Sequence, residues 1–243
     1  MKVYLNKITG IDDAAVAMLM SKRTWTREKE QSLRAVVNEA TNRDGMYCPN
    51  RCSIEVQKGF EILMGKCIKY GVDQMHTTLL RFIDLSFTVE GLHRAGQDDW
   101  DAHTKRMDNR IIRASTRLAD FSDDEKSEWY QGKILYPSEV VDLPPVFVKD
   151  GIEYVLRAFG YVRADLSENR DVKRGLYPEA IPSNFVFKVQ YPELCHIIQF
   201  RDANGHAHPE VQLLAEEIKD AVYSANGWLG DNLTKLQMEP GEK

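Results

Sequence analysis

The sequence predicts an α+β fold, with a mixed or antiparallel sheet flanked by long helices. Helical apolar stripes recur along the chain, alternating apolar and polar residues mark a strand, and the elements do not follow one another as regular strand–helix–strand units. We expect at least six helices and roughly two to four strands. The 243 residues are expected to form a single domain, 1–243, with a helical N-terminal part over about 1–70 and a disordered tail over about 225–243.

The N-terminal part is predicted to be mainly helical. The first ten residues form a strand-like start, and helical patterns cover residues 11–23 and 26–41. A turn-rich stretch at 44–52 precedes a third helical pattern at 54–69. The spacing of the apolar residues in this third helix predicts one buried stripe, formed by Ile54, Val56, Phe60, Leu63 and Met64.

The middle of the chain changes period. Residues 79–91 alternate between polar and apolar side chains, which predicts a strand with one apolar face that ends at Gly91. A long charged helix is expected from about 92 to 118. Its acidic residues lie toward the N-terminal half and its basic residues further on, and Asp101 and Lys105 have the spacing of a helical ion pair.

The C-terminal half contains two stretches whose type the pattern leaves open. Residues 152–162 fit a helix or a strand, and residues 183–190 fit a strand or a buried turn of helix. Two helices are expected to begin at Pro192 and Pro209, because proline suits the first turn of a helix. The second has an apolar stripe of Val211, Leu214, Ala215, Ile218 and Val222.

Charge and composition exclude several classes of protein. The net charge of −5 argues against a general nucleic-acid-binding protein, and no apolar run is long enough to span a bilayer. The N-terminus lacks the features of a signal peptide, so we expect a cytoplasmic protein without a membrane partner. The four cysteines are too few for a disulfide framework, and Cys48 and Cys52 lack the second pair that a zinc site needs, so no metal is expected.

Three segments carry a resemblance to a known family. They are "HTTLLRFIDLSFTVEGLHRA" (76–95), "VKRGLYPEAIPSNFVFKVQYPELCHIIQFR" (172–201) and "HAHPEVQLLAEEI" (206–218). In this order and at this spacing they resemble the flavin-dependent thymidylate synthases, whose first segment ends F-T-F-x-I-E-G-I-S-R-A and whose third reads H-A-Q-x-E-I-x-x-x-A. The residues that match are His76, Phe87, Glu90, Gly91, Arg94, Ala95, Arg174, Pro178, Leu194, Arg201, His206, Ala207, Glu210 and Val211.

The resemblance implies a flavin-dependent thymidylate synthase-like fold and a homotetramer with its sites at subunit interfaces. It also implies methylation or hydroxymethylation at C5 of a pyrimidine nucleoside monophosphate such as dUMP. FAD would be the cofactor, with folate and NADPH as co-substrates. The family needs no protein nucleophile, so no catalytic residue is assigned. The alternative is a flavin-free homologue that binds a nucleotide as a regulatory or structural protein.

The flavin contacts implied by the resemblance are widely altered. The family's arginine–histidine–arginine triplet falls on Ala102, His103 and Thr104, so both arginines are missing. Two asparagines that approach the flavin in the family are replaced by Gln190 and His196. Lys105 and Arg106 are candidates to replace the missing arginines. The flavin-binding residues implied in this way are His76, His103, Lys105, Arg106, Asn109, Gln190 and His196.

The nucleotide phosphate is expected to contact arginines, because a guanidinium offers a fork of donors that matches a phosphate. The resemblance places Arg174 and Arg201 in this role. In one alignment register Arg113 joins them, and in another Ser115 and Arg117 do. His206 and His208, which alternate just before a helix, could form a metal pair, but turn and N-capping roles are expected for them.

Overall fold

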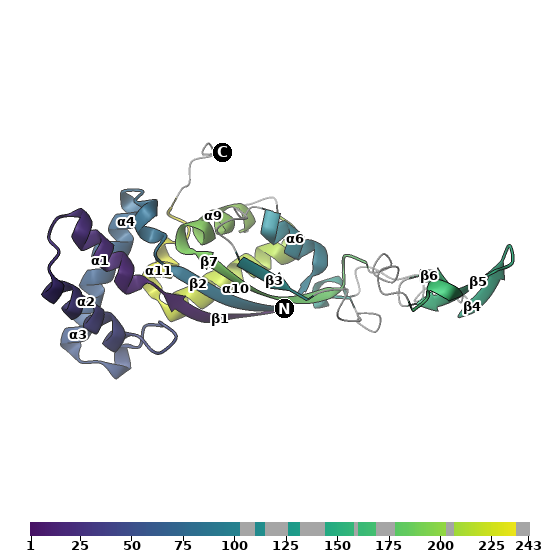
Figure 1. Ribbon diagram of the computed structural model, residues 1–243, viewed down its shortest axis with the longest axis horizontal. Coiled ribbons are helices and arrows are strands. Elements are labelled where there is room, and N and C mark those ends of the chain that lie inside the picture. Colours follow the sequence, from purple (N-terminus) through teal and green to yellow (C-terminus); the bar gives the residue numbers. More distant parts are fainter. Residues whose placement is uncertain are drawn as a thin grey trace.

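The computed structural model describes residues 1–102, 110–114, 126–131, 144–157, 160–168, 178–202 and 207–236. Its main body is built on a four-stranded antiparallel sheet in the order β1-β2-β7-β3 (Figure 1). The strands span Lys2–Thr9 (β1), Asp84–His93 (β2), Arg110–Arg113 (β3) and Pro182–Gln190 (β7). This confirms the predicted mixture of helices with an antiparallel sheet.

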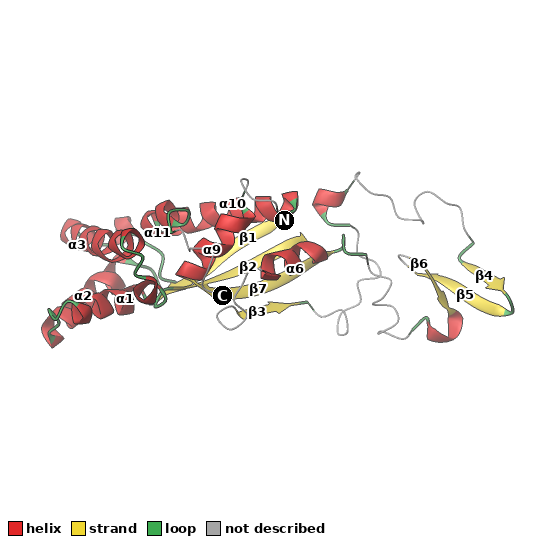
Figure 2. Cartoon of the chain, turned by 90° about the horizontal axis from the view of Figure 1, so that it is seen from above, coloured by secondary structure: helices red, strands yellow, loops and turns green. Residues whose placement is uncertain are grey.

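The apolar face of this sheet forms the centre of the core. Phe87 of β2 pairs with Phe187 of β7, and their rings stack with centroids 4.8 Å apart. Trp100 packs edge-on against Phe187 from the helix side. The helices that cover this face are α6 (Arg94–Ala102), α9 (Tyr191–Arg201) and α10 (Pro209–Ala225), which lie along the strands in Figure 2.

The N-terminal helices pack at one end of the sheet. They are α1 (Ile11–Ser21), α2 (Arg27–Ala40) and α3 (Ile54–Met64), and α3 continues through a π-helical turn (Gly65–Lys69) into α4 (Tyr70–Asp73). The predicted helices are therefore confirmed. Phe60, Leu63 and Met64 are buried as expected, but Ile54 is 63% exposed because it lies in the first turn of α3, beyond the edge of the core. A short 3-10 helix precedes α3 (η1, Pro49–Arg51).

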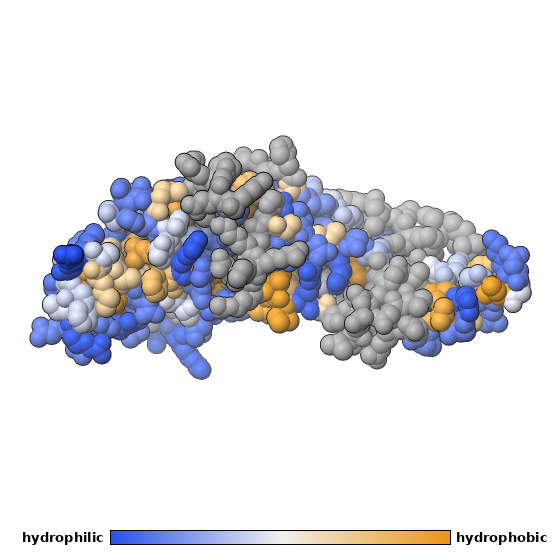
Figure 3. Space-filling model, turned by 45° about the horizontal axis from the view of Figure 1, so that its top comes forward, coloured by the Kyte–Doolittle hydropathy of each residue, from blue (hydrophilic) through white to orange (hydrophobic). Residues whose placement is uncertain are grey.

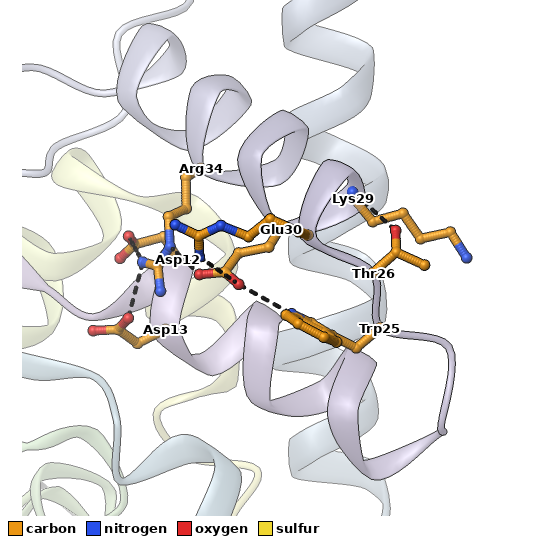
Figure 4. Close-up of polar contacts among 8 residues, drawn as sticks. Asp12, Asp13, Trp25, Thr26, Lys29, Glu30 and Arg34 are labelled. Carbon is orange, nitrogen blue, oxygen red and sulfur yellow. Dashed lines mark hydrogen bonds and ion pairs between the residues drawn. The ribbon is translucent and has the colours of Figure 1, made fainter.

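A polar network fastens α2 to α1 (Figure 4). Arg34 contacts the carboxylates of Asp12 and Asp13 on α1, and its Nε lies 3.1 Å from Glu30 Oε1. The Trp25 indole N–H donates to the other oxygen of Glu30 at 3.0 Å. Glu30 is buried, so these donors compensate for the water that its carboxylate loses.

The surface around these helices is mainly polar. In Figure 3, hydrophilic side chains predominate at this end of the molecule, with apolar groups between them. Among the described residues, no helix combines the length and the apolar character needed to cross a bilayer.

Two predictions in the middle of the chain are wrong in part. Residues Thr77–Leu80 form a short helix (α5), so the strand begins only at Asp84, and it continues past Gly91 to His93 through an irregularity at which Gly91 takes φ +82°. The helix expected over 92–118 ends at Ala102, and Arg110–Arg113 form strand β3. Ile111 and Ile112 are β-branched, and they lie along the edge of β7. Both facts favour a strand paired with β7 over a helix.

Residues 152–162, which fitted either a helix or a strand, contain strands. Val146–Lys149 (β4), Ile152–Arg157 (β5) and Gly160–Arg163 (β6) form a second antiparallel sheet that stands apart from the first in both ribbon views. Short 3-10 helices span Glu128–Tyr130 (η3) and Ala164–Leu166 (η4). The strands therefore outnumber the two to four that the pattern predicted.

The expected disorder of the last twenty residues is wrong over its first part. Gly227–Asn232 form helix α11, and the core includes Leu229, Leu233 and Leu236. The local composition is rich in glycine, but these three leucines are buried in the core where α11 packs against α10, and this burial outweighs the cost of ordering the backbone. Residues 237–243 lie outside the described part of the chain.

Candidate functional site

The best-defined part of the candidate site is an arginine at the end of α9 that faces an acidic turn of α6. Arg201 Nη2 lies 2.8 Å from Asp99 Oδ1 and donates to the main-chain carbonyl of Asp99 at 2.6 Å. The arginine side chain is only 8% exposed. Arg201 is one of the two arginines that the resemblance places at the phosphate. In the structure its side chain is nearly buried and is held in position by Asp99.

One nitrogen of this guanidinium is left without an acceptor in the described part of the chain. Arg201 Nε is buried and has no hydrogen-bond partner among the described residues. Burial lowers the pKa of Arg201, and the carboxylate of Asp99 acts in the opposite direction. A buried donor without an acceptor is costly, so an anion that reached Nε would remove that cost as well as add a charge-assisted hydrogen bond.

Arg113 is engaged on the same acidic turn. From strand β3 its guanidinium contacts Asp98, and its Nη2 lies 3.7 Å from Asp101. A phosphate that approached Arg113 would have to compete with these two carboxylates. The two described arginines of the predicted phosphate set therefore both contact acidic residues of α6, and Arg201 has in addition a buried donor without a hydrogen-bond partner in the described part of the chain.

The described members of the predicted flavin set lie elsewhere, around the junction of β7 and α9. Gln190 is the last residue of β7 and pairs with Asp84, and His196 lies within α9 with its ring edge-on to Phe200. His76 precedes α5, which packs against α9, and its exposed ring tilts against Tyr70. His196 Nδ1 is buried without a hydrogen-bond partner in the described structure.

The other predicted site residues fall outside the described residues. They are His103, Lys105, Arg106, Asn109, Ser115, Arg117 and Arg174. Their roles stay predictions, as does the helical ion pair between Asp101 and Lys105. The structure therefore places Arg113 and Arg201 against neighbouring acidic residues of α6. It places Gln190 and His196 at the N-cap and in the middle of α9, and His76 before a helix that packs against α9.

The structure also reveals a buried polar cluster that the sequence did not predict as a unit. His93, the last residue of β2, contacts the carboxylate of Glu210 in the first turn of α10 through Nδ1. His93 is 1% exposed and Glu210 is 2% exposed. Ser127 Oγ lies 3.5 Å from the same carboxylate oxygen. The signal that could have indicated this cluster is His93 itself, which stands where the family pattern has serine.

His208 completes this cluster and confirms the expected capping role. Its Nδ1 accepts the backbone N–H of Glu210 at 3.1 Å, and its Nε2 lies 3.0 Å from the hydroxyl of Tyr130. The rings of His93 and His208 have centroids 4.4 Å apart. Burial, and secondarily Glu210, raise the pKa of Tyr130, so its hydroxyl stays protonated at neutral pH.

Comparison with known proteins assigns this fold to a family. The family model described as thymidylate synthase complementing protein matches residues 6–225. Among curated proteins, no sequence matches this chain. The residues matched by the family model include all the described candidate site residues and the His93–Glu210 cluster.

Solved structures with the same fold share little sequence. A flavin-dependent thymidylate synthase ThyX from Helicobacter pylori, complexed with FAD and dUMP, has a TM-score of 0.55 at 17% identity, covering 98% of this chain and 100% of its own. A second structure of that enzyme with FAD and dUMP gives the same score and identity over 96% of this chain and 100% of its own. A UMP/dUMP methylase PolB from Streptomyces cacaoi, bound with 5-Br dUMP, has a TM-score of 0.54 at 12% identity, covering 96% and 94%.

Proposed function

The chain belongs to the family of thymidylate synthase complementing proteins, and on this premise we propose that it methylates dUMP at C5 of the pyrimidine with FAD as its redox cofactor. The family match over most of the chain supports the proposal. So do the ligands named for proteins of the same fold, which are FAD and dUMP in the Helicobacter pylori enzyme and 5-Br dUMP in the Streptomyces cacaoi methylase.

The single observation that carries the nucleotide part of this proposal is the unpartnered Nε of Arg201. A nucleoside monophosphate brings nearly two negative charges and several acceptor oxygens, which suit a buried guanidinium. Asp99 holds Nη2, so the side chain is already oriented before a ligand arrives. Arg174 and one of Arg113 and Arg117 are proposed to contact the same phosphate.

The flavin part is supported by His196. Its buried, unpartnered Nδ1 could donate a hydrogen bond to the isoalloxazine ring or accept one from it, and Gln190 is the N-cap of the same helix. His76, His103, Lys105, Arg106 and Asn109 are proposed to complete the flavin site. When bound, reduced flavin supplies the electrons that convert the transferred one-carbon unit to a methyl group.

Finer features of the proposal follow from the family resemblance. A folate is proposed as the one-carbon donor and NADPH as the reductant, in a homotetramer whose sites lie between subunits. A hydroxymethyl product or a UMP substrate remains an alternative outcome of the same chemistry. The protein is proposed to act in the cytoplasm, without a nucleic-acid or membrane partner.

An absorption spectrum of the purified protein tests the flavin. We expect a yellow protein, or one whose melting temperature rises and whose added FAD loses fluorescence on binding. A colourless protein that leaves FAD fluorescence and its own melting temperature unchanged would favour the flavin-free nucleotide-binding homologue, since Ala102 and Thr104 replace both arginines of the family's triplet.

Turnover tests the reaction itself. Release of tritium from dUMP labelled at C5, dependent on reduced flavin and a methylene-folate, is the expected result, and mass spectrometry of the product distinguishes methyl from hydroxymethyl. Light scattering on the same sample tests the homotetramer. A flavin-loaded protein that binds dUMP but releases no tritium would contradict the proposed reaction and leave only the fold assignment.

A further inference from the structure

The cluster around Glu210 offers three metal-ligating side chains in one buried place. One donor atom from each of His93, His208 and Glu210 lies within 4.8 Å of the other two. The residues come from segments that are 117 positions apart in the sequence, the end of β2 and the start of α10. Such a convergence of imidazole and carboxylate donors has the composition of a zinc site with three protein ligands and an open fourth position.

The hydrogen bonds of His208 fix its tautomer. Its Nδ1 lone pair accepts the backbone N–H of Glu210, so a metal ion bound at this nitrogen would take the place of that hydrogen bond. Its Nε2 must then carry the proton if the ring is neutral, and the hydroxyl oxygen of Tyr130 is the acceptor at 3.0 Å. A ligating histidine usually donates its second N–H to a fixed oxygen in this way, which orients the ring and selects the tautomer.

The site is shaped around the His93 ring. A Cβ added to Gly96 on α6 would lie 2.5 Å from His93 Cε1 and 2.8 Å from Nδ1. Any larger residue at this position would therefore overlap the imidazole and displace it. Glycine lowers helix stability, so its presence inside α6 fits a requirement for this space.

The two histidines are departures from the family pattern, whereas the carboxylate is not. Glu210 matches the glutamate of H-A-Q-x-E-I, but His208 replaces its glutamine and His93 replaces the serine of G-I-S-R-A. Serine and glutamine are poor ligands for zinc, and histidine is a strong one. Both departures add an imidazole beside the same carboxylate, although the two positions are far apart in the sequence.

We propose that His93, His208 and Glu210 bind one Zn²⁺ ion, at a site independent of the proposed flavin and nucleotide contacts. Zinc suits a set of two nitrogens and one carboxylate oxygen better than Mg²⁺ or Ca²⁺, which prefer oxygen ligands. Ligand atoms around tetrahedral zinc lie roughly 3.3–3.5 Å apart. The His93 and Glu210 atoms, now in direct contact, would have to separate to admit the ion. The ion would fasten the end of β2 to the start of α10.

The test is zinc binding to a tag-free chain, measured by competition with a chromogenic chelator and by metal analysis after dialysis. The wild type is expected to bind one zinc per chain, to melt at a higher temperature with zinc, and to give the visible absorption of tetrahedral Co²⁺ when cobalt replaces zinc. The double variant H93S/H208Q restores the family pattern and is expected to bind zinc at least about 100-fold more weakly. The single variant E210Q should also lose affinity.

His76→Ser is the matched control, because His76 is an exposed histidine outside the cluster, and its zinc affinity should equal that of the wild type. If replacement of the buried His93 prevents folding, H208Q alone decides the question, because His208 is only half-buried. A folded wild type that binds zinc no better than folded H208Q or the double variant would overturn the proposal and leave a buried histidine–glutamate pair.

Discussion

Asp99 on α6 holds Arg201 at the end of α9 through both its carboxylate, at 2.8 Å, and its main-chain carbonyl, at 2.6 Å. The two residues are 102 positions apart in the sequence. Both contacts go to the same nitrogen, Nη2, while Nε stays buried without a partner among the described residues. The pair therefore fixes the orientation of a guanidinium that still has binding capacity, next to a carboxylate that repels anions.

Arg201→Ala is expected to weaken the binding of dUMP by about 10- to 150-fold, which corresponds to roughly 1.5–3 kcal/mol for a charge-assisted hydrogen bond. Isothermal titration of the purified variant measures this loss. Arg51→Ala is the control, since Arg51 is an exposed arginine in a 3-10 helix of the N-terminal part. Equal affinities in the two variants would contradict the phosphate role of Arg201.

Asp99→Asn tests the other member of the pair. The amide oxygen can still accept from Nη2, but the negative charge is gone, so an incoming phosphate meets less repulsion. We expect dUMP to bind several-fold more tightly at low salt, with the gain shrinking as salt screens the charges. A loss of affinity would show that the carboxylate is needed to orient the guanidinium.

His196→Leu removes the buried Nδ1 and keeps a side chain of similar bulk. FAD affinity, measured by the fluorescence of the flavin, is expected to fall by about 5- to 20-fold, the loss of one ordinary hydrogen bond of roughly 1–2 kcal/mol. The affinity for dUMP at Arg201 serves as an internal control for correct folding. Unchanged FAD binding would place the flavin away from the start of α9.

Gly96→Ala and Gly59→Ala form a matched pair of helical substitutions. At Gly96 the new methyl group would overlap the His93 ring, so a loss of about 1–3 kcal/mol in unfolding free energy is expected from overpacking. At Gly59 it would meet Val36 Cγ1 at 3.5 Å, an ordinary contact, so a gain of about 0.5–1 kcal/mol is expected from helix propensity. Denaturant unfolding compares the two, and a stabilised Gly96→Ala would contradict the packing around His93.

The loss of folding stability at acidic pH should depend on Glu30. The indole N–H of Trp25, followed by the Arg34 guanidinium, lowers the pKa of Glu30 below its usual value of 4.5. Because the folded-state pKa is lower than the unfolded one, the stabilisation is present above pH 4.5 and is lost as pH falls through the folded pKa. Glu30→Gln should flatten this loss, and parallel curves for the two proteins between pH 5 and about 3 would show that Glu30 contributes nothing.

The local parts of the fold could be predicted because their signals are local. The alternation around Phe87 predicted the buried face of β2, and the stripe from Val211 to Val222 predicted α10. The prediction of a helix over 92–118 was wrong at Arg110–Arg113, because these residues form β3 by pairing with β7. Strand β7 lies far along the chain, and no local pattern shows that its edge is available for pairing. The same limit applied to residues 152–162, whose strand type depends on pairing within a second sheet.

The sequence by itself determined the family, the main helices and the apolar face of the central sheet, since each rests on residue type and spacing along the chain. Only the tertiary structure decided which charged groups meet. It paired Arg201 with Asp99 and Arg113 with Asp98, and it placed His93 against Glu210. The reason is that an ion pair or a ligand cluster depends on distances of a few ångströms, and these are set by how β2, α6, α9 and α10 pack on the sheet.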